Sequence, residues 1–177
     1  MGQRGKEAAF MPSKYVFPGG GVDDADAAMA LAPHYLADRC RHRLVQSCLQ
    51  DAPDADAIGH AALRELAEET GLVPAPGFSM RFVFRAITPP GRSRRFDARF
   101  FLVAASDVAG DQTLFAQASD ELSHLHWVDL DAARQLDLPF ITEVVLSEVA
   151  AILHGQDQPG VPFFDNSGPR PAFRRLD

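Results

Sequence analysis

Residues 61–72, Ala-Ala-Leu-Arg-Glu-Leu-Ala-Glu-Glu-Thr-Gly-Leu, constrain the fold of this 177-residue chain more than any other segment. If they form a helix, Glu65, Glu68 and Glu69 occupy positions i, i+3 and i+4, so three carboxylates share one face. Apolar side chains on the rest of the helix would pack it against a sheet. Gly71 suits the left-handed conformation that ends many helices. The segment therefore predicts an amphipathic helix with a concentrated acidic face.

The close spacing of these carboxylates needs a cause, because like charges on one helix face repel and lower its stability. A bound divalent metal would relieve the repulsion, since carboxylate oxygens are the ligands that Mg²⁺ prefers. The alternative is a solvated acidic face, which is the usual role of a run of charges. The motifs around the helix favour the metal site.

Two separated motifs resemble the Nudix box. The second half of that box has the pattern Arg-Glu-apolar-x-Glu-Glu-x-Gly-apolar, and the matching residues are Arg64, Glu65, Leu66, Glu68, Glu69, Gly71 and Leu72. Upstream, the sequence Phe-Pro-Gly-Gly at 17–20 resembles the Pro-Gly-Gly that opens the box. Each half is specific, so we expect a Nudix-type site.

A long insertion separates the two halves. The family expects a glutamate shortly after Pro-Gly-Gly, and Asp26 stands at that position. The family then has seven residues before Arg-Glu, whereas residues 27–63 supply 37 here. A box interrupted in this way resembles the coenzyme A diphosphatase branch of the Nudix hydrolases.

The resemblance implies an α/β fold, a Nudix-type α/β/α sandwich with a mixed sheet and an inserted helix inside the box. It also implies that water hydrolyses the pyrophosphate bond of a nucleoside diphosphate linked to another group, with Mg²⁺ or Mn²⁺ as cofactor. The metal ligands that it implies are Glu65, Glu68, Glu69 and the carbonyl of Gly19. Arg64 would orient the carboxylates, through Glu68 or a neighbour.

Glu121 is a candidate for the general base. A glutamate shortly before a strand tryptophan resembles the late acidic residue that completes the site in many Nudix enzymes, and Asp120 is its substitute. We expect residues 121–129 to form that strand. A surface charge is the alternative role for Glu121, and the base is left open between Glu121 and the three helix glutamates.

Arginines supply the candidate phosphate contacts, because guanidinium groups match phosphate geometry. Arg92, Arg94 and Arg95 lie in the loop between two predicted strands, 80–88 and 96–104, and with Arg99 on the second strand they form the densest basic cluster of the chain. A solvated loop is the alternative. Strict alternation along the first strand would separate its arginines from its phenylalanines, with Arg81 and Arg85 on one face and Phe82 and Phe84 on the other.

The beginning of the chain departs from the family, whose members lead into Pro-Gly-Gly with a long apolar strand. We expect that N-terminal strand to be missing. Arg4, thirteen residues before Phe17, resembles the arginine of the signature that precedes the box in coenzyme A hydrolases. It is therefore a candidate phosphate contact, with an exposed terminal arginine as the alternative.

The insertion, residues 27–57, is predicted to be helical to about Gln50 and peripheral, because its apolar residues recur at helical spacing. An exposed lid and a dimer surface are open roles for it. His34 and His42 have no carboxylate or cysteine partner at the spacing of a metal site, so we do not expect them to bind metal.

Local signals also predict element boundaries. Asp54 or Asp56 should cap the acidic helix. A further helix should begin at an acidic cap, Asp137, end at Gly155 and cover a sheet face with a stripe of apolar side chains. The tail, residues 159–177, should contribute two short edge strands.

Composition limits the function classes. A net charge of -7 argues against a nucleic-acid binder, but a bound metal and local arginines can still attract a phosphorylated small molecule. Cys40 and Cys48 fit a reducing compartment, and no segment has the length of a membrane span. We expect a single domain, residues 1–177, in the cytoplasm, with no nucleic-acid or membrane partner and with a homodimer left open.

The leading functional hypothesis is a metal-dependent hydrolase whose substrate is coenzyme A or acyl-CoA. The enzymatic alternative is hydrolysis of ADP-ribose, NADH or another nucleotide derivative. A non-catalytic Nudix-like nucleotide sensor is the alternative from a different class. Substituted glutamates would mark such a sensor, whereas all three glutamates of the box remain here.

Overall fold

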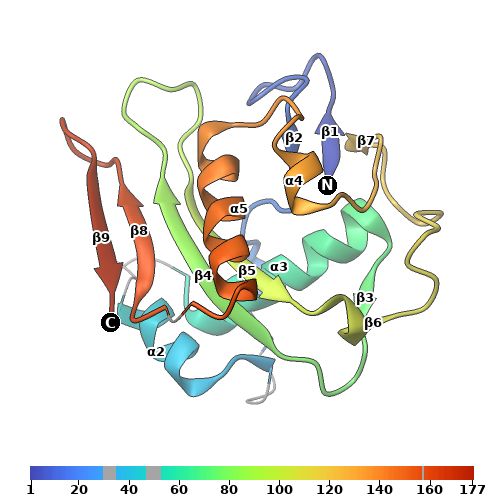
Figure 1. Ribbon diagram of the computed structural model, residues 1–177, viewed down its shortest axis with the longest axis horizontal. Coiled ribbons are helices and arrows are strands. Elements are labelled where there is room, and N and C mark those ends of the chain that lie inside the picture. Colours follow the sequence, from blue (N-terminus) through green and yellow to red (C-terminus); the bar gives the residue numbers. More distant parts are fainter. Residues whose placement is uncertain (30–34, 47–52, 157) are drawn as a thin grey trace.

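The computed structural model describes residues 1–29, 35–46, 53–156 and 158–177 (Figure 1). Its helices are α1 (Asp24–Ala27), α2 (Asp38–Gln46), α3 (Ala55–Thr70), α4 (Leu130–Ala133) and α5 (Phe140–Leu153), with a 3₁₀ turn at Ala105–Asp107. Its strands are β1 (Gly2–Arg4), β2 (Tyr15–Val16), β3 (Val73–Pro74), β4 (Met80–Ile87), β5 (Asp97–Val103), β6 (Val108–Ala109), β7 (Leu122–Ser123), β8 (Val161–Asp165) and β9 (Ala172–Leu176).

A four-stranded mixed sheet in the order β5-β4-β8-β9 forms the centre of the fold. β4 pairs antiparallel with β5 and parallel with β8, and β8 pairs antiparallel with β9. α2 and α3 pack on one face of this sheet, and α5 packs on the other. The expected α/β/α sandwich with a mixed sheet is therefore confirmed.

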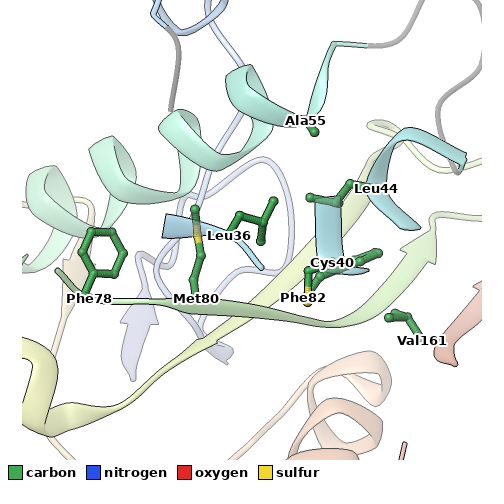
Figure 2. Close-up of a cluster of buried hydrophobic side chains, with 8 residues drawn as sticks. All are labelled: Leu36, Cys40, Leu44, Ala55, Phe78, Met80, Phe82 and Val161. Carbon is green, nitrogen blue, oxygen red and sulfur yellow. The ribbon is translucent and has the colours of Figure 1, made fainter. Parts of the chain in front are cut away.

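The core between the sheet and α2 and α3 includes side chains from the insertion (Figure 2). Its buried members are Leu36, Cys40, Leu44, Ala55, Phe78, Met80, Phe82 and Val161. Leu36 and Leu44 are completely buried, and each such side chain contributes about 1.5–3 kcal/mol. The prediction of a peripheral insertion is therefore wrong, because its apolar side chains complete the main core.

The insertion is also not one helix from Ala27 onward. α1 ends at Ala27 and α2 begins at Asp38. The inserted helix itself is confirmed as α2. His34 and Cys48 lie outside the described residues, while Cys40 is a buried free thiol.

The hairpin of β4 and β5 is confirmed, but the predicted faces of β4 are wrong. The register shifts between Phe82 and Phe84, where β4 carries a bulge relative to β5. An extra residue in one strand reverses the face of every residue after it. Phe82 consequently packs towards α3 and Phe84 towards α5, and Arg81 and Arg85 no longer share a face.

α5 covers the opposite face of the sheet with the predicted apolar stripe. The stripe residues that pack against Val83, Phe84 and Ala86 are Ile141, Val144, Val145, Val149 and Ile152. The helix is followed, as predicted, by Gly155 with a positive φ of 77°. Its N-cap is Pro139 and not the expected Asp137, whose carboxylate instead pairs with Lys14.

The two ends of the chain differ from expectation. A strand does precede Pro-Gly-Gly, because β1 pairs with both β2 and β7 in a second, antiparallel sheet. Of the two strands in the tail, β8 lies inside the four-stranded sheet and β9 is at its edge. The strand predicted at 121–129 is confined to Leu122–Ser123, and His124 has a positive φ of 52°.

No helix among the described residues is long and apolar enough to cross a membrane. The assignment of residues 1–177 to a single domain stays a prediction.

Candidate metal and diphosphate site

The acidic helix of the sequence is α3, and both of its predicted ends are present. The Asp54 side chain accepts a hydrogen bond of 2.7 Å from the backbone N–H of Ala57, which caps the first turn. Gly71 adopts the left-handed conformation, with φ of 72°, and its N–H donates to the carbonyl of Ala67. These local caps hold the acidic face at the C-terminal half of α3.

Glu69 is the buried member of that face, with 2% of its surface exposed. The backbone N–H of Gly19 donates to its Oε2 at 2.7 Å, whereas its buried Oε1 has no hydrogen-bond partner. The pKa of Glu69 is raised to about 7, mainly by burial and also by the charges of Glu121 and Glu65, while the Gly19 hydrogen bond and the charge of Arg4 oppose the rise. The Pro-Gly-Gly loop thus lies directly against the acidic helix.

Gly20 shows how closely the loop and the helix approach. A Cβ atom at this position would overlap the Glu65 carboxylate. Only glycine allows the backbone to pass this side chain without moving it. Any other residue at position 20 would therefore displace the Glu65 carboxylate.

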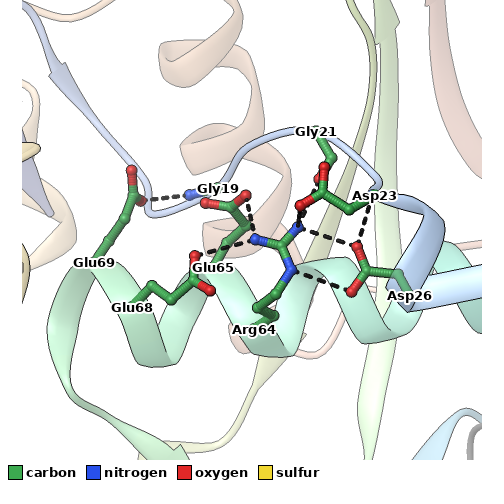
Figure 3. A network of polar contacts seen from close by, with 8 residues as sticks. All are labelled: Gly19, Gly21, Asp23, Asp26, Arg64, Glu65, Glu68 and Glu69. Carbon is green, nitrogen blue, oxygen red and sulfur yellow. Dashed lines mark hydrogen bonds and ion pairs between the residues drawn. The ribbon is translucent and has the colours of Figure 1, made fainter. Parts of the chain in front are cut away.

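Arg64 joins the two halves of the box (Figure 3). Its Nε and Nη2 donate to the two carboxylate oxygens of Asp26 at 3.2 and 3.0 Å, and Nη2 also donates to the carbonyl of Gly21 at 2.9 Å. Its Nη1 donates to Glu65 at 2.9 Å and to Glu68 at 3.1 Å. The predicted i+4 contact with Glu68 is therefore present, but it is one of several.

Asp26 is buried, with 4% of its surface exposed, although it is a carboxylate. The hydrogen bonds from Arg64 lower its pKa and keep it ionised, because an opposite charge compensates for its burial. Asp26 and Arg64 are separated by 38 positions and nevertheless form a bidentate pair. The insertion therefore interrupts the motif in sequence without separating its halves in space.

Arg4 and Glu121 complete the cluster around Glu69. Arg4 Nη2 lies 3.4 Å from Glu121 Oε1, and the charges of both residues influence the Glu69 carboxyl. The loop that carries Glu121 is fixed to α3, since the N–H of Ser119 donates to the carbonyl of Glu68 at 2.8 Å. Asp120, the substitute for Glu121, is exposed.

Comparison with protein families identifies a NUDIX domain at residues 51–147, which is more than half of the chain. The protein belongs to the Nudix family. It is a Nudix pyrophosphohydrolase, a hydrolase that acts on acid anhydrides in nucleoside diphosphate derivatives. Comparison with curated proteins and with solved structures gives no match.

Nudix enzymes generally use divalent metals such as Mg²⁺ or Mn²⁺. The donors of the Nudix helix fit such ions, because they are hard carboxylate oxygens and the buried Oε1 of Glu69 lacks a partner. Within the described ranges, no three His, Cys, Asp or Glu side chains are gathered as a metal-binding group. The contacts explain this, since Arg64 binds Glu65 and Glu68 while Gly19 binds Glu69.

The three loop arginines of the Nudix enzyme, Arg92, Arg94 and Arg95, are exposed beyond the ends of β4 and β5. Arg95 donates to the carbonyl of Thr88 at 3.2 Å, which holds it at the base of the loop. Among the described residues, no hydrogen bond or ion pair joins these arginines to the acidic cluster, so of these three and Arg4 only Arg4 lies beside Glu121 and Glu69.

Sequence reasoning missed that Arg85 on β4 and Arg99 on β5, the latter a candidate phosphate contact, have buried side chains. Both are ion-paired with Asp97. Their signal was a charge placed within strands that are otherwise mostly apolar, since such residues are rarely buried unless paired.

Proposed function

We propose that this Nudix enzyme hydrolyses the pyrophosphate bond of coenzyme A or acyl-CoA. The observation that carries the proposed site is the buried Glu69 carboxylate, which contacts Gly19 and has one orphaned oxygen. The proposed substrate is supported by the interrupted box, whose halves the Arg64–Asp26 pair joins.

The proposed metal ligands are Glu65, Glu68, Glu69 and the carbonyl of Gly19. Bound Mg²⁺ or Mn²⁺ would stabilise the negative charge that develops on the diphosphate and activate the attacking water. Glu65 and Glu68 must leave their Arg64 contacts in part for this role, while the Oε1 of Glu69 is already available.

Arg64 is proposed as a positioning residue, because its contacts are with carboxylates and a loop carbonyl. Its anchoring by Asp26 fixes the guanidinium from one side and leaves Nη1 to orient the helix glutamates. The proton of the attacking water is accepted by Glu121 or by one of the helix glutamates. Glu121 is favoured by its exposure and by its proximity to Glu69.

The proposed phosphate contacts are Arg4, Arg92, Arg94 and Arg95. Arg4 is supported by its place beside Glu121, where its guanidinium can face both the acidic cluster and a diphosphate. The loop arginines are supported by their concentration in a chain of net charge -7.

Product analysis tests this function. The enzyme would be incubated with Mg²⁺ and then Mn²⁺ and with coenzyme A, acyl-CoAs, ADP-ribose, NADH and nucleoside triphosphates. Release of phosphopantetheine and adenosine 3′,5′-bisphosphate is the expected result. Cleavage of ADP-ribose or NADH alone would refute the coenzyme A substrate, and binding without any turnover would favour a nucleotide sensor.

Two variants test the site in the same assay. Glu68→Gln should lose most metal-dependent turnover, because a neutral amide is a weaker ligand for a hard cation. Glu143→Gln is the matched control. Glu143 is exposed on α5, and this helix packs against the face of the sheet opposite to α3. Full activity of Glu68→Gln would show that the metal site is misplaced.

A further inference from the structure

Two arginines on β4 and β5 have no role in the proposed reaction. Arg85 and Arg99 are register partners on the two strands, and their side chains are 5% and 7% exposed. Arg85 donates two bonds to the Asp97 carboxylate, of 2.8 and 2.6 Å. Arg99 Nη2 lies 3.1 Å from the same carboxylate, and its Nη1 donates to the Asp97 carbonyl at 2.7 Å. These three residues are called the Arg85–Asp97–Arg99 cluster.

Positive charge is concentrated at this end of the hairpin. Residues 85–99 contain five arginines and one acidic residue, Asp97, in a chain whose net charge is -7. Asp97 serves both buried guanidinium groups, and the nearby Asp165 has an arginine of its own, Arg174, at 3.0 Å. A basic region of this kind attracts a localised anion, and arginine suits a phosphate.

The cluster is preorganised. Arg85 is held by its bidentate pair with Asp97 and by the ring of Phe163, whose centroid lies 4.2 Å from the guanidinium carbon. The side chain of Asp97 is 30% exposed, so the cluster opens to solvent at this residue. Ligand binding here would cost little side-chain conformational entropy, because the arginine side chains are already ordered.

The cluster lies on the α3 side of the sheet. Arg99 and Phe101 are two positions apart on β5 and therefore share a face. Phe101 packs against the same core as Leu63 of α3. Leu63 precedes Glu65 by only two positions on α3, so the cluster lies on the face of the sheet that this helix covers.

The Pro-Gly-Gly loop also passes the cluster. β5 is one of the two edge strands of the four-stranded sheet. On the α5 face of the sheet, Phe17 packs against Phe100, the residue after Arg99, with 6.2 Å between their ring centroids. Two residues later, Gly19 contacts Glu69. The loop thus runs from the edge of β5, one residue along the strand from Arg99, to the acidic helix.

We propose that the Arg85–Asp97–Arg99 cluster binds a second anionic group of the substrate, a phosphate monoester on the nucleoside outside the cleaved diphosphate. This inference rests on the proposed function for the position of the diphosphate. It assigns the enzyme to substrates that carry such a phosphate, which coenzyme A has and ADP-ribose and NADH lack. The exposed loop arginines would lie at the mouth of this subsite.

Equilibrium binding tests the proposal without catalysis. Titration calorimetry in EDTA would compare adenosine 3′,5′-bisphosphate with AMP, which lacks only the second phosphate monoester. We expect the bisphosphate to bind the wild-type protein about tenfold tighter or more, because a charge-assisted hydrogen bond has about this worth. Equal affinities would overturn the proposal.

Three variants locate the effect. Arg99→Gln should reduce the preference to near unity, whereas Asp97→Asn should keep or increase it by removing the carboxylate that competes for both guanidinium groups. Arg134→Gln, a change at an exposed arginine after α4, is the control and should retain the preference. An unchanged preference in Arg99→Gln, or its loss in a folded Asp97→Asn, would overturn the proposal.

Arg95→Gln replaces Arg99→Gln in this test if Arg99→Gln does not fold. Its position is exposed, so the substitution should leave the fold intact, and it should weaken bisphosphate binding several-fold.

The outcomes also separate this inference from the proposed function. Hydrolysis of nucleoside diphosphate derivatives without any preference for the bisphosphate would refute only the subsite. A preference without hydrolysis of coenzyme A would refute only the proposed substrate.

Discussion

Burial of Glu69 should make the metal-free protein less stable as the pH rises. Its carboxyl has a pKa of about 7 in the folded protein and an ordinary value of 4.5, with burial as the main cause. Below pH 4.5 the carboxyl is protonated in both states, so there is no penalty. Between pH 4.5 and 7 the unfolded chain releases the proton first, and the free energy of unfolding falls.

The size of this penalty follows from the two pKa values. Their difference corresponds to about 3 kcal/mol, which is reached above pH 7 and stays constant at higher pH. Glu69→Gln cannot ionise and keeps an oxygen that can accept from Gly19. The variant should therefore match the wild-type protein near pH 4.5 and exceed its stability by about 3 kcal/mol at pH 8.

Urea unfolding in EDTA at several pH values measures this difference directly. Glu143→Gln is the control, because Glu143 is exposed on α5. Parallel stability curves for Glu69→Gln and wild type would refute the claim that burial of this carboxylate governs the trend. Added Mg²⁺ should recover stability in the wild-type protein above pH 7 and much less in Glu69→Gln, since the metal would compensate the buried charge.

Three further predictions concern the box and the core. Asp26→Asn should lower the free energy of unfolding at pH 7 by about 1.5–3 kcal/mol in urea unfolding, because Arg64 loses the charge of its buried bidentate partner, and a loss below about 0.5 kcal/mol would contradict this role. Leu44→Ala should lower the free energy of unfolding by about 2–5 kcal/mol, because it leaves a cavity in the core. Val45→Ala, at the exposed neighbouring residue, is the control and should lower it far less. Equal losses in the two variants would contradict the packing of α2 in the core. Gly20→Ala should lower metal-dependent turnover more than thermal stability, because the added methyl displaces the Glu65 carboxylate, and unchanged turnover would refute this contact.

Local patterns were sufficient for several elements. Asp54 and Gly71 cap the two ends of α3 as predicted, because a cap depends only on residues within one turn of the helix. The apolar stripe of α5 was equally readable from its period. The β4–β5 hairpin was found for the same reason, since an alternating run, a Pro-Gly loop and a second run adjoin in sequence.

Features that depend on distant partners were not predicted. The bulge of β4 at Phe82 and Phe84 follows from its pairing with β5, and the place of β8 inside the sheet follows from its neighbours β4 and β9. The strand β1 is three residues long and is stabilised by β2 and β7 on both sides. No local period reveals such a strand, because its hydrogen bonds go to residues far along the chain.

The sequence by itself determined which side chains the candidate site can offer. The spacing of the glutamates places them on one face of a helix, and the glycines of the interrupted box allow a tight turn. Only the tertiary structure decided how these residues meet. Arg64 binds Asp26 across the insertion, and Glu69 lies buried against Gly19. Burial and charge pairing arise from contacts between segments that are distant in sequence, and these contacts set the pKa of Glu69 and the ionised state of Asp26.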